Sequence, residues 1–130
     1  MKEVILCVDD EKIVLSSLKT QLKRLFGEKF NYEFAESAEE ALEIIDEISG
    51  MGVLIIVSDW LMPGIKGDEF LIKVHQKFPG IVKVLLTGQY DEEAAKRAKE
   101  GANLHALIQK PWKEEELYEI IMNGLHKDGK

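Results

Sequence analysis

The amino-acid sequence predicts an α/β domain in which helices cover both faces of a five-stranded parallel sheet. Short apolar runs recur five times along the chain, and segments with a helical spacing of apolar residues separate them. Three of the runs are continuously apolar and rich in Val and Ile, which is typical of central strands buried on both faces. Strands and helices that alternate in this order favour a doubly wound fold with right-handed crossovers.

The five apolar runs are the predicted strands. They are Val4–Val8, Tyr32–Ala35, Val53–Val57, Val82–Leu86 and Ala106–Ile108. In the second run, Glu33 stands between two aromatic residues. This alternation indicates a strand near an edge of the sheet, where one face is less covered.

The first two connecting segments have the pattern of amphipathic helices. Apolar residues recur at helical spacing from Glu11 to Phe26, and Gly27 is expected to end that helix. Ser37 and Glu40 form the sequence pattern of a capping box at the start of the second helix. Both helices are expected to pack one apolar face on the sheet.

The third and fourth connecting segments are also predicted to be helical. Asp68 opens the third helix, and Pro79-Gly80 stops it. Asp91 opens a shorter fourth helix with a stripe of alanines, and Gly101 is expected to end it.

The last helix is predicted after Pro111. It begins with three glutamates, where the helix dipole favours acidic side chains, and its apolar stripe ends at Leu125. Residues 1–125 are thus expected to form a single domain. Residues 126–130 are expected to be a flexible tail or the start of a linker.

Length, charge and cysteine content exclude several classes of function. The 130 residues, 45% of them apolar, suffice for one domain with a buried core. The net charge of −7 disfavours nucleic-acid binding by this chain, because such binding requires clustered Lys and Arg. The single Cys7 cannot form an internal disulfide. No apolar run could span a bilayer and no secretory signal is found, so we expect a cytoplasmic location and no membrane partner.

The residues that directly follow the predicted strands are the candidate functional residues. In an open parallel sheet, ligands bind outside the carboxyl ends of the strands. The first, third, fourth and fifth strands are followed by polar or conformationally special residues, which are Asp9, Asp10, Asp59, Thr87, Gly88, Lys110 and Pro111. Three carboxylates, a hydroxyl and an ammonium group should therefore meet at one edge of the sheet.

Three acids at one edge indicate a divalent cation. Each residue alone has an ordinary structural interpretation, as a helix cap, a turn residue or a surface charge. Together, however, the carboxylates repel one another, and a bound cation would remove that repulsion. Mg²⁺, or Mn²⁺, suits hard oxygen ligands. The charges of Mg²⁺ and the Lys110 ammonium would balance the three carboxylates.

Four motifs at the predicted strand ends carry a family resemblance. They are Asp9-Asp10, Asp59-Trp60-Leu61-Met62-Pro63-Gly64-Ile65-Lys66-Gly67, Thr87-Gly88 and Lys110-Pro111. On these motifs the chain resembles, over nearly its whole length, a receiver domain of two-component response regulators. The resemblance implies a flavodoxin-like (βα)5 fold with strand order 2-1-3-4-5.

The resemblance implies a role for each acidic residue. Asp59 is the implied phosphoacceptor, which attacks the phosphorus of a phosphohistidine on a sensor histidine kinase or phosphotransfer protein. Asp10, Asp59 and the backbone carbonyl of Leu61 are the implied Mg²⁺ ligands, and Asp9 acts through a metal-bound water. The domain would then be a signalling module that switches an output domain or effector, and not an enzyme acting on a metabolite.

The remaining motif residues are implied to hold the phosphoryl group. Lys110 would pair with one phosphoryl oxygen and the Thr87 hydroxyl would bond another, while Gly88 leaves space for the group to enter. A cis peptide before Pro111 would direct Lys110 into the site. Two residues flank the route of the hydrolytic water, and we expect apolar Leu61 to slow loss of the phosphoryl group and Gln89 to hasten it.

One position departs from the family pattern. An aromatic residue three positions before the lysine normally rotates on phosphorylation, but Leu107 stands there and has neither a ring nor a hydroxyl. The usual aromatic readout is therefore not implied. The long segment before this strand, together with Lys110-Pro111-Trp112, resembles receivers that precede transcriptional activators or cyclic-dinucleotide phosphodiesterases. Trp60 is expected to be a partly exposed aromatic residue at the rim of the site.

Several alternatives remain open from the sequence. The face formed by the fourth helix, fifth strand and fifth helix is where many receivers form homodimers or dock an output, although its mixed charges also suit a solvated surface. A Mg²⁺-dependent aspartyl phosphatase would normally have an acid two residues after the nucleophile, where this chain has Leu61. A flavin-binding domain of similar topology is a further alternative. The last alternative is a phosphorylation-independent interaction module, and the presence of Leu107 keeps this alternative open.

Overall fold

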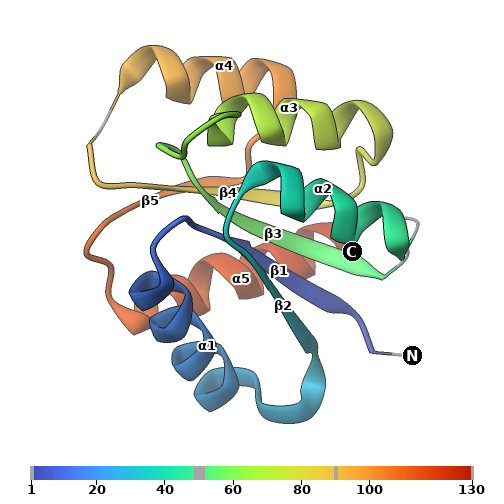
Figure 1. Ribbon diagram of the computed structural model, residues 1–130. Coiled ribbons are helices and arrows are strands. Elements are labelled where there is room, and N and C mark those ends of the chain that lie inside the picture. The colour runs from blue at the N-terminus through green and yellow to red at the C-terminus, as the bar shows by residue number, and fades with distance from the viewer. Residues whose placement is uncertain (1, 49–51, 90, 130) are drawn as a thin grey trace.

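Five parallel strands form one sheet in the order β2-β1-β3-β4-β5 (Figure 1). The computed structural model describes residues 2–48, 52–89 and 91–129. The strands are β1 (Val4–Val8), β2 (Asn31–Ala35), β3 (Val53–Asp59), β4 (Val82–Thr87) and β5 (Ala106–Gln109). The helices are α1 (Lys12–Phe26), α2 (Ala38–Glu47), α3 (Gly67–Lys77), α4 (Glu92–Ala102) and α5 (Glu114–Gly129), and η1 (Gly27–Lys29) is a 3-10 turn. The predicted fold class, strand order and edge position of β2 are confirmed.

Helices cover both faces of the sheet, as the doubly wound pattern predicts. Figure 1 shows α2, α3 and α4 on one face and α1 and α5 on the other. Each face has its own buried apolar cluster, since successive side chains of a strand point to opposite sides. In β1, Leu6 and Val8 belong to one cluster, whereas Ile5 and Cys7 belong to the other. The isolated thiol of Cys7 is a fully buried core group.

The two central strands extend further than their apolar runs. The run predicted as Val53–Val57 continues as β3 to Asp59, and all seven of its residues are buried. Strand β4 likewise continues to Thr87. Asp59 pairs in register with Leu86 of β4, and the next amide, that of Trp60, donates to the Leu86 carbonyl at 2.9 Å. The sheet therefore fixes the backbone of Asp59, instead of leaving it in a mobile turn.

Two helix starts follow their predicted caps, whereas Asp68 does not cap α3, which begins one residue earlier at Gly67. The Ser37 hydroxyl accepts from the Glu40 amide at 3.0 Å, and the Asp91 carboxylate accepts from the Ala94 amide at 2.9 Å. The first helix ends at Gly27, which has a positive φ of 57°. These local bonds satisfy amide groups that a helix start leaves without partners.

The end of α4 differs from the prediction. Gly101 does not end α4 but lies inside it, and the helix ends at Ala102 with Asn103 in the left-handed conformation. A Cβ on Gly101 would lie 2.9 Å from the Ile72 side chain, so the glycine permits close packing of α4 on α3. Helix α5 runs to Gly129, past the apolar stripe that ends at Leu125. Among the described residues, no helix is long and apolar enough to cross a membrane.

Candidate functional site

Three carboxylates meet at the carboxyl edge of the sheet. One oxygen each from Asp9, Asp10 and Asp59 lies within 4.8 Å of the other two. Asp9 is completely buried and Asp59 nearly so, whereas Asp10 is exposed. Three oxygens at this spacing can share one metal ion, and the exposed side leaves room for water ligands.

Lys110 joins the two buried carboxylates. Its Nζ lies 2.9 Å from Asp9 Oδ2 and 3.0 Å from Asp59 Oδ1, and it is 3.8 Å from a carboxylate oxygen of Glu11. The exposed fraction of the Lys110 side chain is 17%. The lysine therefore neutralises part of the negative charge from within the site.

Backbone bonds hold these side chains at the sheet edge. The Asp9 amide donates to the Ala35 carbonyl at 3.1 Å, and the Asp9 carboxylate accepts from the Glu11 amide at 2.9 Å. On the other side, the Lys110 amide donates to the Thr87 carbonyl at 2.8 Å. The peptide bond between Lys110 and Pro111 is cis, as expected. The end of β1 thus brings Asp9 and Asp10, the end of β3 brings Asp59 and the end of β5 brings Lys110 to one point.

The environment makes Asp59 unusually basic. The pKa of its carboxyl rises from 3.8 to about 6, mainly because of burial; the charges of Asp9 and Asp10 also raise it, while Lys110 lowers it. Burial lowers the pKa of Lys110, but its hydrogen bonds to Asp9 and Asp59 outweigh this effect and raise that pKa above its usual value. A carboxylate at such a site has a stronger tendency to bind a proton, a cation or another electrophile.

Thr87 lies at the predicted edge but bonds its own loop. Its buried hydroxyl donates to the Gln89 carbonyl, and the Gln89 amide donates back to Thr87 Oγ1 at 3.1 Å. In the described part of the chain this hydroxyl forms no hydrogen bond with the acidic residues or Lys110. The structure therefore brings Asp9, Asp10, Asp59 and Lys110 together, whereas Thr87 would have to exchange partners to join them.

The other predicted residues differ in their exposure. Gly88 and Gln89 are exposed, and 46% of Leu61 is exposed, so both residues predicted to affect the hydrolytic water are accessible to solvent. Leu107 pairs with Leu85 and packs, partly buried, against the cluster under α2, α3 and α4. Leu107 is thus a partly buried residue of the edge strand β5.

Trp60 is not a partly exposed rim residue; the prediction is wrong. Only 8% of it is exposed, and its indole nitrogen donates to Asp68 Oδ1 at 3.1 Å. The other Asp68 oxygen accepts from Arg97 of α4 at 2.9 Å. The ring can be buried because Asp68 accepts a hydrogen bond from the indole nitrogen, which is the only polar group of the side chain. Trp60 therefore belongs to the core between the sheet and α3.

Gly67 is required by a close approach. A Cβ at this position would overlap with the carbonyl oxygen of Asp59, and the Gly67 amide donates to the Trp60 carbonyl at 2.8 Å. Gly64 serves the turn itself, with a φ of 81°. These contacts fold the loop after β3 back on the strand end that holds Asp59.

Sequence reasoning missed Glu11, Asp68 and Arg97. Glu11 adjoins the Asp9-Asp10 pair, and that adjacency was an available signal. In the sequence, Asp68 has only the pattern of a residue at a helix start. Its pairing with Arg97 could not be predicted, because it depends on how α3 packs on α4.

Comparisons with known proteins agree with this geometry. A family model for the response regulator receiver domain matches residues 5–122. The hydrogenase transcriptional regulatory protein HoxA of Cupriavidus necator is 30% identical over 125 residues, which cover 96% of this chain and 24% of that protein. A cyclic di-GMP phosphodiesterase of Thermotoga maritima is 31% identical over 107 residues, covering 82% of this chain and 27% of that protein. This chain spans about a quarter of either relative.

Solved structures give the same result for the fold. The signal receiver domain of an HD domain-containing protein from Pseudomonas fluorescens Pf-5 superposes with a TM-score of 0.89 and 26% identity. The match covers 99% of this chain and 98% of that domain.

Proposed function

This chain belongs to the response regulator receiver domain family, and we propose that it accepts a phosphoryl group on Asp59 in a Mg²⁺-dependent reaction. The donor is a phosphohistidine on a sensor histidine kinase or a phosphotransfer protein. The observation that carries the proposal is the Lys110 ammonium within 3.0 Å of both buried carboxylates, with Asp10 completing the acidic cluster.

The donor set fits a magnesium ion. Three carboxylates and one ammonium leave a charge of −2 when all four are ionised. Asp10, Asp59 and the Leu61 carbonyl would hold the ion, and Asp9 would act through a water ligand. Mg²⁺, or Mn²⁺, would supply positive charge beside the transferred group.

The chain's own residues would align and neutralise the transfer. A carboxylate oxygen of Asp59 forms a bond to phosphorus while the bond from phosphorus to the donor histidine nitrogen breaks, and the histidine keeps that electron pair. The Lys110 ammonium exchanges its contact with Asp59 for one with a phosphoryl oxygen and keeps its contact with Asp9. Thr87 releases the Gln89 carbonyl and donates to another phosphoryl oxygen.

Intact mass spectrometry tests the transfer. We expect the protein incubated with Mg²⁺ and acetyl phosphate to gain the mass of one phosphoryl group. The reaction without Mg²⁺ should not give this product, and the variant Asp59→Asn should not give it either. Asp10→Asn should slow its formation. Absence of any adduct with several phosphodonors would contradict the proposal.

The signal would pass to an output domain or an effector protein. The relatives are named as a transcriptional regulator and a cyclic di-GMP phosphodiesterase, and this chain spans only a quarter of them. We infer a cytoplasmic receiver that controls an output of this kind through the α4, β5 and α5 face, including by forming a homodimer there. Leu107 is partly buried and has no aromatic ring, so we expect the output to detect a change other than rotation of an aromatic ring.

A further inference from the structure

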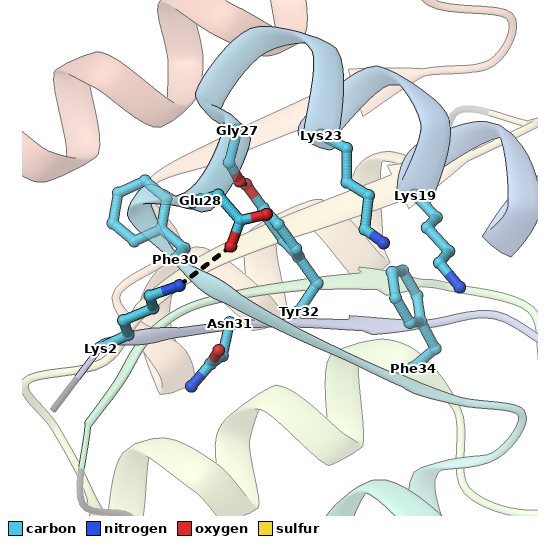
Figure 2. A pocket seen from close by; sticks show the side chains of 9 residues that line it. All are labelled: Lys2, Lys19, Lys23, Gly27, Glu28, Phe30, Asn31, Tyr32 and Phe34. Carbon is cyan, nitrogen blue, oxygen red and sulfur yellow. Dashed lines mark hydrogen bonds and ion pairs between the residues drawn. The ribbon is translucent and has the colours of Figure 1, made fainter.

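A cleft between α1 and the edge strand β2 combines lysines with aromatic rings (Figure 2). Its volume is about 410 Å³. It is lined by Lys2, Lys19, Lys23, Gly27, Glu28, Phe30, Asn31, Tyr32 and Phe34. None of these residues belongs to the acidic site; Lys2 precedes β1 and Asn31 begins β2, so both lie near the opposite, amino edge of the sheet. The volume falls in the range of small-molecule sites.

Two of the lysines have no acidic partner among the described residues. Glu28, the one acidic residue among those that line the cleft, pairs with Lys2 at 3.2 Å. In the described residues no carboxylate oxygen lies within 4 Å of the Lys19 or Lys23 ammonium. These two residues are four apart on α1, so they share a helical face and repel each other. An anion bound between them would remove this repulsion.

The local charge contrasts with that of the whole molecule. Residues 12–30 contain five basic residues and one acidic residue, giving a charge of +4. Because the net charge is −7, the rest of the chain carries −11. This contrast favours a small anion in the cleft, since a long polyanion would also meet the acidic remainder of the surface.

The aromatic part of the cleft is held in place. Tyr32 and Phe34 alternate along β2, so both rings face α1, where they pack on the core partly buried. The Tyr32 hydroxyl donates to the Gly27 carbonyl at 2.8 Å, which fixes that ring. Figure 2 shows the Phe34 ring at the end of the cleft near the ammonium groups of Lys19 and Lys23. A planar ring beside two cations matches a ligand with an aromatic ring and an anionic group.

We propose that this cleft binds a small aromatic anion of mononucleotide size. The ligand's ring packs on Phe34, and its phosphate lies between Lys19 and Lys23. An anion without a ring leaves the aromatic surface unused, and a neutral aromatic compound forms no ion pair with the exposed ammonium groups of Lys19 and Lys23. The proposal does not depend on phosphorylation of Asp59.

Calorimetric titration with three related compounds tests the site. The probes are AMP, ribose 5-phosphate, which lacks the base, and adenosine, which lacks the phosphate. The titrations contain EDTA, so that no metal bridges a phosphate to the acidic site. We expect saturable binding of AMP, with the other two compounds at least about tenfold weaker.

Paired variants separate the site from general charge effects. We expect Lys19→Gln with Lys23→Gln to weaken AMP binding at least about tenfold. The control, Lys73→Gln with Lys99→Gln, makes the same charge change at exposed positions outside the cleft and should leave the affinity unchanged. Phe34→Leu keeps an apolar side chain and should reduce the preference for AMP over ribose 5-phosphate.

Three results would each overturn the proposal. They are absence of AMP binding at millimolar concentration, equal affinity for ribose 5-phosphate, and equal weakening by the control pair. Thermal unfolding of every variant shows whether the compared proteins are folded. If Phe34→Leu does not fold, the double lysine variant still tests the site.

Discussion

The Asp59 carboxylate is destabilised by the site that surrounds it. Its pKa rises from 3.8 to about 6, mainly because the group is buried. Between these pH values the folded protein binds more protons than the unfolded chain, so its stability falls as the pH rises through the window. Above pH 6 the ionised carboxylate reduces stability by up to about 3 kcal/mol. Replacing this carboxylate should therefore stabilise the metal-free protein.

Urea unfolding of Asp59→Asn in EDTA measures this effect. At pH 7 we expect the variant to be about 1–3 kcal/mol more stable than wild type, with a difference that shrinks between pH 6 and pH 4. Glu33→Gln, which changes an exposed carboxylate on β2, is the control and should change stability by less than about 0.5 kcal/mol. A difference that does not vary with pH would show that burial of Asp59 is not its cause.

Leu61 and Gln89 offer a second prediction at the residue scale. Both are exposed and follow the ends of β3 and β4 by two residues, so we expect them to affect the approach of water to an acyl phosphate. We expect Leu61→Asn to shorten the lifetime of phosphorylated protein and Gln89→Ala to lengthen it, each by up to about tenfold, or about 1.4 kcal/mol in the barrier. The measurement follows loss of the phosphoryl mass after the phosphodonor is removed. If both variants match wild type, neither residue controls the water.

At the scale of elements, Asp68 connects the loop after β3 with helix α4. Its carboxylate is 1% exposed and accepts hydrogen bonds from Trp60 and Arg97. Although Arg97 is half exposed, its partner is buried, so removing Arg97 leaves a buried charge with a single donor. The link therefore stabilises the packing of α3 and α4.

A neighbouring pair of substitutions tests this link. We expect Arg97→Ala to lower the free energy of unfolding by about 1–3 kcal/mol. Lys96→Ala, on the same helix but with an exposed side chain, should change it by less than about 0.5 kcal/mol. Asp68→Asn with Arg97→Ala should recover part of the loss, because no buried charge then remains. Equal effects of the two alanine substitutions would contradict the role of Asp68.

The sequence predicted the elements well because each had a local signal. Apolar runs mark the strands, and the caps at Ser37 and Asp91 mark helix starts. Gly101 was misinterpreted because a glycine in a helix that packs on Ile72 looks the same in sequence as one that ends a helix. Long-range packing, which one sequence does not display, made the difference.

The site followed from topology more than from any single residue. Asp9, Asp59 and Lys110 could be grouped in advance because parallel strands end at one edge of a sheet. The burial of Trp60 could not be predicted, since it depends on Asp68 as a hydrogen-bond partner from another element. The α1 and β2 cleft could not be predicted either, because its lysines and rings come from segments that meet only in the fold.

At the scale of the whole molecule, metal binding should be linked to folding. The three carboxylates converge only in the folded state, so an ion that binds them stabilises the fold by mass action. At a Mg²⁺ concentration of about 100 times the dissociation constant, the gain is about 2.7 kcal/mol. Thermal unfolding with and without Mg²⁺ should show a higher midpoint for wild type and a much smaller increase for Asp59→Asn. An equal increase of the unfolding midpoint in both proteins would show that the ion binds at another site.

The central claim is that Asp59 itself receives the phosphoryl group. Borohydride reduces an acyl phosphate to an alcohol, so it marks the acceptor permanently. After treatment with acetyl phosphate and Mg²⁺, peptide mapping by mass spectrometry should find homoserine at position 59 and aspartate at positions 9 and 10. Homoserine at another position, or at none while the intact protein carries a phosphoryl group, would contradict the account.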